Sequence, residues 1–315
     1  MGTTSLVIFA VLFGLSLIAE ILSNDKPLVA RYEGSWYFPV VQTLPETTFG
    51  GDFVTPTDYL DPQIQQNMSR GENFALFPLN RYHHGTINYF ASEPSPSAPG
   101  RENLLGTDDR GRDLLARLVY GFRLSVVFAL IVTVLVSLIG ILYGAIQGYF
   151  AGWTDIGMER VKEIWGSMPV LYMLIIFSSL FSASFGLLVV LLSLFGWLGI
   201  AAYVRAARAL GQSNRKIIWR HILPNSLTPV VTLIPFEMAA AIGALTSLDF
   251  LGLGVPPGTP SLGELLNQGK NNLDAWWISL STFGVLMVML LLLILIGDAL
   301  RDALDPRKVL KEEEA

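Results

Sequence analysis

The chain has 315 residues, of which 52% are hydrophobic and only 15% are charged, against about 25% charged in an ordinary soluble protein. Its 21 Lys and Arg residues and 26 Asp and Glu residues give a net charge of −5, which excludes a strongly basic nucleic-acid-binding protein as the default. The absence of cysteine excludes disulfides, thiolate metal sites and cysteine nucleophiles. This composition predicts a membrane protein.

Long stretches without Asp, Glu, Lys or Arg predict transmembrane helices, because a span needs about 20 mostly apolar residues. The longest uncharged run, residues 164–204, is long enough for two spans, with a turn expected at Ser182–Gly186. The six expected spans lie within residues 6–22, 124–154, 164–204 (two spans), 221–248 and 275–297. The sequence thus predicts an all-α membrane protein with about six transmembrane helices.

Residues 1–23 are expected to form an N-terminal transmembrane anchor. A cleaved signal peptide is the alternative, but the segment has no positively charged start and no A-x-A cleavage site. Lys and Arg concentrate at residues 205–220 and 301–311, and basic loops of membrane proteins lie on the cytoplasmic side. With six spans, both termini are therefore expected in the cytoplasm.

Residues 24–107 differ from the rest of the chain, because they are rich in Pro, Tyr, Asn, Ser and Asp and lack a long apolar run. They are expected to form a small, irregular extracytoplasmic insert after the first helix, too short for an enzyme domain. Trp36–Val41 is predicted to be a strand or an apolar patch near the lipid headgroups. Pro94–Gly100 has the composition of a linker.

Residues 108–121 have an amphipathic pattern. Asp109 and Arg112, like Asp113 and Arg117, have the spacing of neighbours on one side of a helix, and leucines occupy the other side. This pattern predicts a short helix that lies in the outer membrane interface before span two, with a solvated entry helix as the alternative.

Gly140, Gly144 and Gly148 recur at every fourth residue of the span within 124–154. Their missing side chains leave one smooth helix face, on which another helix can approach closely. The ladder therefore predicts helix packing. It says little about a substrate, because small-residue faces are common in proteins with several spans.

The basic segment 203–225 predicts two short helices followed by a span. Gly211 suits the left-handed position after the first helix, Ser213 is a natural N-cap for the second, and Pro224 fits the first turn of the span. The small side chains of Ala206–Ala207 allow the first helix to sit deep in a partner's groove. The alternative is a solvated basic loop, which explains the arginines but not two helices hinged on one glycine.

The spacing A-A-x-x-x-G, followed after nine residues by H-x-L-P, resembles the EAA loop of ABC importer permeases. In that family the loop docks on the ATP-binding subunit as a coupling helix. The resemblance implies that the coupling residues are Arg205, Ala206, Ala207, Gly211, His221, Leu223 and Pro224. Arg205 replaces the name-giving Glu, and this change is associated, like His221, with the dipeptide/oligopeptide branch. The loop follows span four without the extra helical stretch expected of relatives, so the coupling helix is expected close to the membrane.

Three further blocks resemble the same branch and occur in its order. They are Leu105–Asp113 (LGTDDRGRD), Asp249–Pro257 (DFLGLGVPP) and Gly297–Pro306 (GDALRDALDP). The insert, with Trp36–Pro39, and the segment Ser261–Leu266 resemble the Yej-type permeases, a branch associated with uptake of microcin C and oligopeptides.

The resemblance implies a type I ABC importer permease fold at residues 108–305, with the EAA loop at 202–225, a cytoplasmic tail at 306–315 and a periplasmic insert at 24–107. It implies a multi-pass peptide-transport subunit of the bacterial inner membrane rather than an enzyme, with no catalytic residue, metal or cofactor. The implied partners are a second permease subunit in a heterodimer, ATP-binding cassette subunits, a periplasmic substrate-binding protein, a peptide substrate and the lipid bilayer, but no nucleic acid.

Glu237 is the only acidic residue well inside an expected span. A carboxylate at this depth is a candidate functional group, so Glu237 is a candidate residue of the translocation path, with a structural hydrogen bond to a neighbouring helix as the alternative. A proton- or sodium-coupled secondary transporter would use such a residue as its coupling site. That function fits poorly, because no His or Lys lies at similar depth and the spans show no internal repeat.

Overall fold

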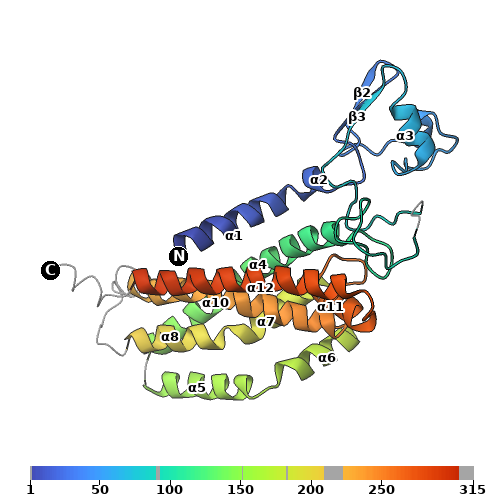
Figure 1. Ribbon diagram of the computed structural model, residues 1–315. Helices are drawn as coiled ribbons and strands as arrows, with labels where there is room; N and C mark the ends of the chain where they lie inside the picture. The colour runs from blue at the N-terminus through green and yellow to red at the C-terminus, as the bar shows by residue number, and fades with distance from the viewer. Residues whose placement is uncertain (1, 90–92, 151, 182–183, 209–222, 305–315) are drawn as a thin grey trace. The chain divides into compact units, whose positions relative to one another are not determined.

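The computed structural model describes residues 2–89, 93–150, 152–181, 184–208 and 223–304 (Figure 1). The chain divides into two compact units. Unit 1 takes its residues from 1–10, 125–257 and 287–315, and unit 2 takes its residues from 11–124 and 258–286. Helices α1, α4 and α12 contribute residues to both units.

Four helical stretches in the described part of the chain are long and apolar enough to cross a membrane. They are α4 (Leu114–Phe150), the stretch Phe185–Ala202 formed by α7 (Phe185–Gly196) and the start of α8 (Leu198–Arg208), the part Val230–Phe250 of α10 (Leu223–Phe250), and α12 (Trp276–Ala303). Many of their large apolar side chains are exposed, such as Leu142 and Leu291. Exposed apolar surface on this scale is typical of helices that face lipid.

Two of the six expected spans fall on shorter helices. The first falls on α1 (Gly2–Leu17), with 16 residues, and the third falls on α6 (Val170–Leu180), with 11 residues. At about 1.5 Å per residue, α6 measures roughly 16 Å, about half of the hydrocarbon thickness of a bilayer. Pro169 stands at its N-cap, and the chain is extended again at Phe181. The expected turn is followed by α7, whose N-cap Ser184 accepts a hydrogen bond from the backbone N–H of Leu187.

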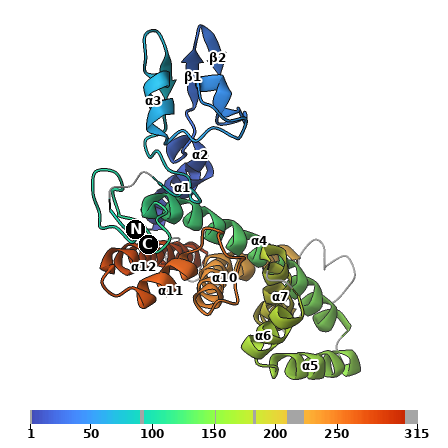
Figure 2. The ribbon, with the colours of Figure 1, turned by 90° about the vertical axis from the view of Figure 1, so that its right-hand side faces the viewer.

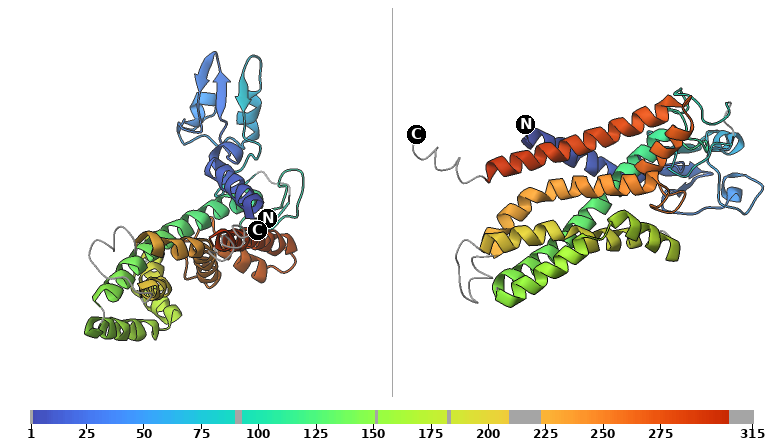
Figure 3. Two further views of the ribbon diagram at one scale, coloured as in Figure 1. Left: turned by 90° about the vertical axis from the view of Figure 1, so that its left-hand side faces the viewer. Right: turned by 90° about the horizontal axis from the view of Figure 1, so that it is seen from below.

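In unit 1, helix α5 (Gly152–Gly166) follows α4, and α8 packs along α10 (Figure 3). Helix α5 is the polar member of this unit and carries charged side chains on successive turns. The polar sequence of α5 interrupts two apolar stretches, which explains why this helix is not among the membrane-crossing candidates.

In unit 2, residues 24–89 contain the described strands, which form one antiparallel sheet with the order β2-β1-β3 (Figure 2). The strands are β1 (Val29–Tyr32), β2 (Ser35–Tyr37) and β3 (Phe74–Leu76). The prediction of a strand at Trp36–Val41 is confirmed for Trp36 and Tyr37 only. Pro39 cannot donate a ladder hydrogen bond, so the strand ends before it.

The sheet is covered on one face by α3 (Pro62–Met68) and by the 3-10 helix η1 (Glu46–Phe49). The hydrophobic core of this part consists of Ala30, Phe49, Tyr59, Ile64 and Met68. The rings of Tyr32, Tyr37 and Tyr59 each meet Phe49 edge to face at 5.6–5.7 Å. The expectation of an irregular insert is therefore wrong for this part, because these aromatic residues bury enough apolar surface to hold a short sheet against a helix, whereas most of residues 24–107 lies outside regular elements.

The predicted helix at 108–121 is wrong in its first half, because α4 begins only at Leu114. Residues 108–113 form a loop, in which the carboxylate of Asp108 accepts hydrogen bonds from the backbone N–H groups of Arg110 and Arg112. Such local side-chain bonds compete with the helix. Gly111 adds a positive φ of 79°, which side-chain-bearing residues rarely adopt.

Two short helices complete unit 2. Helix α2 (Ala19–Leu22) follows α1, and α11 (Leu262–Asn271) precedes α12. Ser261 is the N-cap of α11 and accepts a hydrogen bond from the backbone N–H of Glu264.

Candidate functional site

The residues of the coupling segment are described in part. Ala206 and Ala207 lie in the last turns of α8, and Leu223 and Pro224 form the first turn of α10. Gly211 and His221 lie outside the described residues, as does the whole stretch 209–222. The described flanks of the segment are therefore the end of α8 and the start of α10.

The glycine ladder of α4 meets α8 within unit 1. A methyl group built on Gly140 would lie 2.7 Å from Cβ of Ile200, and one built on Gly144 would lie 2.5 Å from the carbonyl oxygen of Ala201. Real Cβ atoms do not approach so closely, so only glycine allows this contact. Gly148, one turn further along α4, is partly buried. The ladder thus packs against the helix that leads into the coupling segment.

Arg205 forms a fork between α8 and α5. One of its terminal nitrogens, Nη2, lies 2.7 Å from Oδ2 of Asp155, and the other, Nη1, lies 2.9 Å from Oε2 of Glu159. Gln147 of α4 donates a 2.6 Å hydrogen bond to the same oxygen of Glu159. Lys162 reaches it as well, at 3.2 Å. Three helices of unit 1 therefore meet at this one group of polar side chains.

Hydrogen bonds within the fork favour the charged forms of its members. The hydrogen bond from Arg205 lowers the pKa of Asp155, and the hydrogen bond from Gln147 lowers the pKa of Glu159. The hydrogen bond to Asp155 in turn raises the pKa of the Arg205 guanidinium. Because all three side chains are partly exposed, the fork acts mainly by orienting α8 and contributes little to overall stability.

Glu237 lies on α10 and is partly buried. Its carboxylate makes no hydrogen bond or ion pair with any residue that the structure describes. The structural alternative for this residue, a hydrogen bond to a neighbouring helix, therefore finds no support within the described part of the chain.

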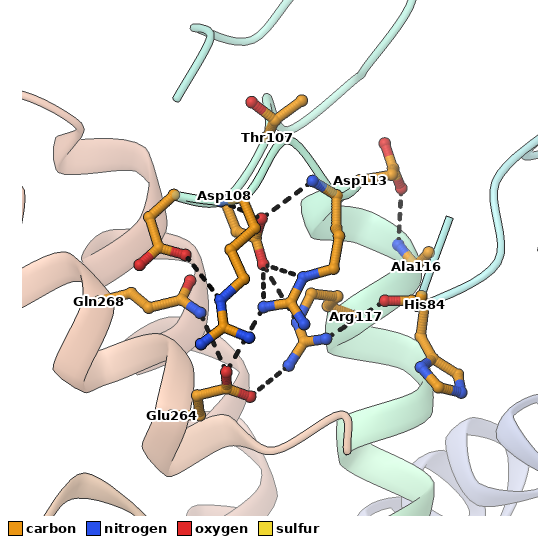
Figure 4. A network of polar contacts seen from close by, with 12 residues as sticks. His84, Thr107, Asp108, Asp113, Ala116, Arg117, Glu264 and Gln268 are labelled. Carbon is orange, nitrogen blue, oxygen red and sulfur yellow. Dashed lines mark hydrogen bonds and ion pairs between the residues drawn. The ribbon is translucent and has the colours of Figure 1, made fainter. Parts of the chain in front are cut away.

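In unit 2, a buried network of charges connects the loop before α4 with α11 (Figure 4). Nη2 of Arg112 lies 2.6 Å from Oδ2 of Asp108, and Nη2 of Arg117 lies 2.6 Å from Oε2 of Glu264. Nε of Arg117 also lies 3.4 Å from Asp108. The side chains of Asp108 and Arg117 are fully buried, and that of Glu264 is 21% exposed. Two buried cations and two carboxylates thus neutralise one another.

Arg117 makes further contacts beyond these carboxylates. Its terminal nitrogens donate hydrogen bonds to the backbone carbonyls of His84 at 3.2 Å and Thr259 at 3.1 Å. The guanidinium therefore ties together three segments that are far apart in the sequence. The planar fork of an arginine suits such a position, because it offers five donors in fixed directions.

Asp113 caps α4 and does not pair with Arg117 as the sequence pattern predicted. It accepts hydrogen bonds from the backbone N–H of Ala116 and from the side-chain amides of Asn80 and Asn103, at 2.7–2.8 Å. Burial nevertheless raises the pKa of this carboxyl. The predicted pair of Asp109 with Arg112 is also replaced, by the pair of Arg112 with Asp108.

Two histidines of unit 2 stack beside this network. The rings of His83 and His84 lie 4.0 Å apart between centroids, and both contact the ring of Tyr120. Nδ1 of His84 is buried, and no residue in the described ranges forms a hydrogen bond with it. Burial, followed by the charge of His83 and of nearby arginines including Arg117, lowers the pKa of His84 to about 4.

The sequence pattern missed four important partners: Gln147, Asp155, Glu159 and Glu264. The spacing of Asp155 and Glu159, four residues apart on one helix, was the available signal. Ser261 and Glu264 look like a capping box, in which Glu264 would bond the backbone of Ser261. The carboxylate of Glu264 accepts hydrogen bonds from arginines of the loop and of α4, and from Gln268 on its own helix.

Residues 201–309 match the family described as "Binding-protein-dependent transport system inner membrane component". The chain is 46% identical to the inner membrane ABC transporter permease protein YejE of Escherichia coli K12, over 98% of this chain and 94% of that protein. It is 43% identical to the peptidoglycan transport system permease protein YejE of Agrobacterium fabrum, over 98% and 91%. It is 35% identical to the oligopeptide transport system permease protein OppC of Mycobacterium tuberculosis H37Rv, over 74% and 84%.

A solved structure of the MetNI methionine ABC transporter, in an inward-facing conformation, is similar in fold. The TM-score is 0.51 at 17% identity, over 61% of this chain and 97% of that chain. The similarity to ABC transporter permeases is therefore seen in the fold as well as in the sequence. The chain belongs to the family of inner-membrane permease components of binding-protein-dependent ABC transport systems.

Proposed function

We propose that this chain is the permease subunit of an ATP-driven importer of peptides, in which a separate subunit binds and hydrolyses ATP. Relatives named as oligopeptide and peptidoglycan permeases support a substrate that contains peptide bonds. Microcin C, a peptide-containing molecule, falls within the same class. The chain itself acts as a binding and translocation subunit rather than as an enzyme.

The observation that carries this proposal is the position of α8. The glycine ladder of α4 holds one side of α8, and Asp155 and Glu159 of α5 hold Arg205 near its end. The coupling segment 202–225 includes the end of this doubly held helix. A push of the ATP-binding subunit on the segment would therefore reach α4 and α5 together, as the coupling role requires.

The coupling segment is proposed to face the cytoplasm, together with both termini, and residues 24–107 to face the periplasm. The arginines and lysines of 205–220 support this orientation. A second, different permease subunit is proposed to complete the pore, because a translocation path between two subunits needs a partner for the helices of unit 1. A periplasmic binding protein is proposed to deliver the peptide.

Glu237 is proposed to line the translocation path. Its partly buried carboxylate has no partner among the described residues of this chain, so a substrate or the second subunit is left to contact it. An ion-coupled secondary transporter is the competing function for the same residue. The family membership of the chain favours the ATP-driven importer.

The proposal is tested by capture of the ATP-binding subunit on the tagged chain, with the variant Gly211→Arg as the matched control. We expect stoichiometric capture by the unmodified chain and its loss in the variant, because a bulky cation at the hinge displaces the coupling helix. Equal and correct membrane insertion of both chains is verified by protease accessibility. Absence of capture by the inserted, unmodified chain would refute the proposal.

A further inference from the structure

A cleft of about 440 Å³ lies between α3 and β3 in the insert. This volume is within the range of about 300–1,000 Å³ that is typical of ligand sites. Figure 1 shows the two elements next to each other at the end of the sheet. The cleft is mainly polar, with Gln65, Gln66 and Asn73 among its lining residues, and Arg81 is also part of its wall.

The cleft meets residues that point to both faces of β3. Phe74 and Ala75 are consecutive strand residues, so their side chains point to opposite faces, and both line the cleft. Ala75 packs toward the core, whereas Phe74 is 49% exposed on the other face. A cleft beside the strand edge can meet both residues.

The edge of β3 that faces the cleft is available for pairing. β3 stands at the end of the sheet order and pairs with β1 alone among the described strands. An edge strand presents backbone N–H and C=O groups that another extended chain can use. An incoming segment that pairs with all three residues of β3 would cover about 10 Å of the edge.

The guanidinium of Arg81 supplies a charge at this cleft. It lies over the ring of Phe77, with Cζ 4.6 Å from the ring centroid. No carboxylate in the described part of the chain pairs with it. A guanidinium that is held in place by a ring and lacks a carboxylate partner suits a carboxylate ligand, because two parallel hydrogen bonds can form.

From these observations we infer that the insert binds an extended peptide as a fourth strand along β3, with the free C-terminal carboxylate of the peptide on Arg81. Gln65 and Gln66 line the cleft with uncharged polar side chains, which suits peptides of varied sequence. This inference rests on the proposed peptide transport and adds to it a receiving site on the permease itself. Addition of a strand at a sheet edge is a common mode of peptide recognition.

The chain has no cysteine, so one introduced cysteine can be labelled without background. Glu72→Cys places an environment-sensitive dye beside the cleft, because Glu72 is 91% exposed and is not a lining residue. The labelled full-length chain in nanodiscs is titrated with penta-alanine that carries a free carboxylate. We expect a saturable change of fluorescence, with at least about tenfold weaker binding of the C-terminally amidated peptide.

Two comparisons separate the site from non-specific binding. Arg81→Gln should weaken binding of the free-acid peptide about tenfold and leave binding of the amidated peptide unchanged. Arg70→Gln, at a nearby arginine outside the lining, should change the binding of neither peptide. Two further penta-alanines carry N-methyl groups on every second backbone nitrogen, one on the odd positions and the other on the even positions. Their affinities for the cleft should differ, because an added strand donates only every second N–H to its neighbour. Equal binding of both methylated peptides and the parent, or an Arg81→Gln chain that binds like the unmodified chain, would overturn the inference.

Peptide uptake by the assembled importer is measured in parallel, to separate this inference from the proposed function. Uptake without a fluorescence response at the cleft would refute the receiving site and leave the proposed function in place. A fluorescence response without uptake would support the receiving site and refute the proposed function. The expected result is both a response and uptake, with Arg81→Gln raising the peptide concentration needed for half-maximal uptake.

Discussion

Arg117 donates a 2.6 Å hydrogen bond to Glu264, and the arginine side chain is entirely shielded from solvent. These residues are 147 positions apart in the sequence. The contact joins the first turn of α4 to the first turn of α11 inside unit 2. Together with the contact between Arg112 and Glu264, it ties the start of α4 to the helix that precedes α12.

Loss of the Glu264 carboxylate should destabilise the protein strongly. Glu264→Ala leaves the buried guanidinium of Arg117 with Asp108 alone, and removal of one member of a buried pair typically costs about 3–5 kcal/mol. We expect a clearly lower temperature of unfolding of the purified chain in nanodiscs. Glu163→Ala is the matched control, since Glu163 pairs with Arg160 on the surface, and its effect should be below about 1 kcal/mol. Equal effects of the two substitutions would contradict the buried role of the network.

Substitution of Arg205 should affect coupling more than stability. Arg205→Glu places a carboxylate against Asp155 and Glu159, so α8 is repelled from α5 where it leads into the coupling segment. We expect a change in stability of at most about 1 kcal/mol, because these side chains are partly exposed. Peptide-stimulated ATP hydrolysis by the assembled importer should fall several-fold. The triple variant Arg205→Glu, Asp155→Lys, Glu159→Gln should restore it, because it reverses one pair and adds no cation beside Lys162. Failure of this rescue would argue against the fork.

The two helical glycines Gly144 and Gly157 should respond in opposite directions to alanine. A Cβ on Gly144 would collide with the carbonyl oxygen of Ala201 and with Val204, and overpacking of this kind costs about 1–3 kcal/mol. A Cβ on Gly157 meets nothing within 4 Å, so Gly157→Ala should stabilise α5 by up to about 1 kcal/mol. Thermal unfolding of both variants in the same nanodiscs measures the difference. A tolerated Gly144→Ala would mean that α4 and α8 do not pack as described.

Acid should destabilise unit 2 through His84. Its pKa is about 4 in the folded protein against about 6.5 in an unfolded chain, so the unfolded state binds the proton more readily. The stability contributed by the neutral ring is complete above pH 6.5 and is lost as the pH falls toward 4. The groups around it, His83, Arg112, Arg117 and Arg123, oppose a further positive charge.

The loss through His84 is about 1–2 kcal/mol after allowance for its partial exposure. His84→Gln should flatten the decrease in unfolding temperature between pH 7 and pH 5, and this difference is the measurement. His83→Gln, at the other ring of the stack, serves as the comparison, because burial lowers the pKa of His83 as well. An unchanged pH dependence in both variants would contradict the assignment.

Glu237→Gln should leave assembly intact and alter transport. The substitution keeps the size of the side chain and removes its charge, and the carboxylate has no described partner whose loss would unfold the chain. We expect normal capture of the ATP-binding subunit and a several-fold change in peptide uptake. Unchanged uptake would assign Glu237 to helix packing instead of the translocation path.

Much of the fold follows from local patterns in the sequence. Uncharged runs predicted the long helices α4, α10 and α12, because a membrane requires apolar side chains over a minimum length. Glycine spacing predicted a packing face on α4, although nothing in the sequence named α8 as the partner. The predicted start of the helix at residue 108 was wrong by several residues. Helix periodicity cannot reveal that a side chain such as Asp108 bonds the neighbouring backbone.

The ion partners could not be predicted from spacing. A pair of charges at i,i+4 is visible in one dimension, so Asp113 and Arg117 appeared to belong together. The fold instead brings Glu264 to Arg117 across more than a hundred residues. Such contacts depend on tertiary structure, and only the fold reveals them.

The position of Glu264 has a consequence for local unfolding. Because its carboxylate neutralises buried arginines, the first turn of α11 cannot fray without leaving Arg112 and Arg117 short of a counter-charge. The loop that holds Asp108, the first turns of α4 and the start of α11 should therefore open and close together, as one cooperative segment in amide hydrogen exchange.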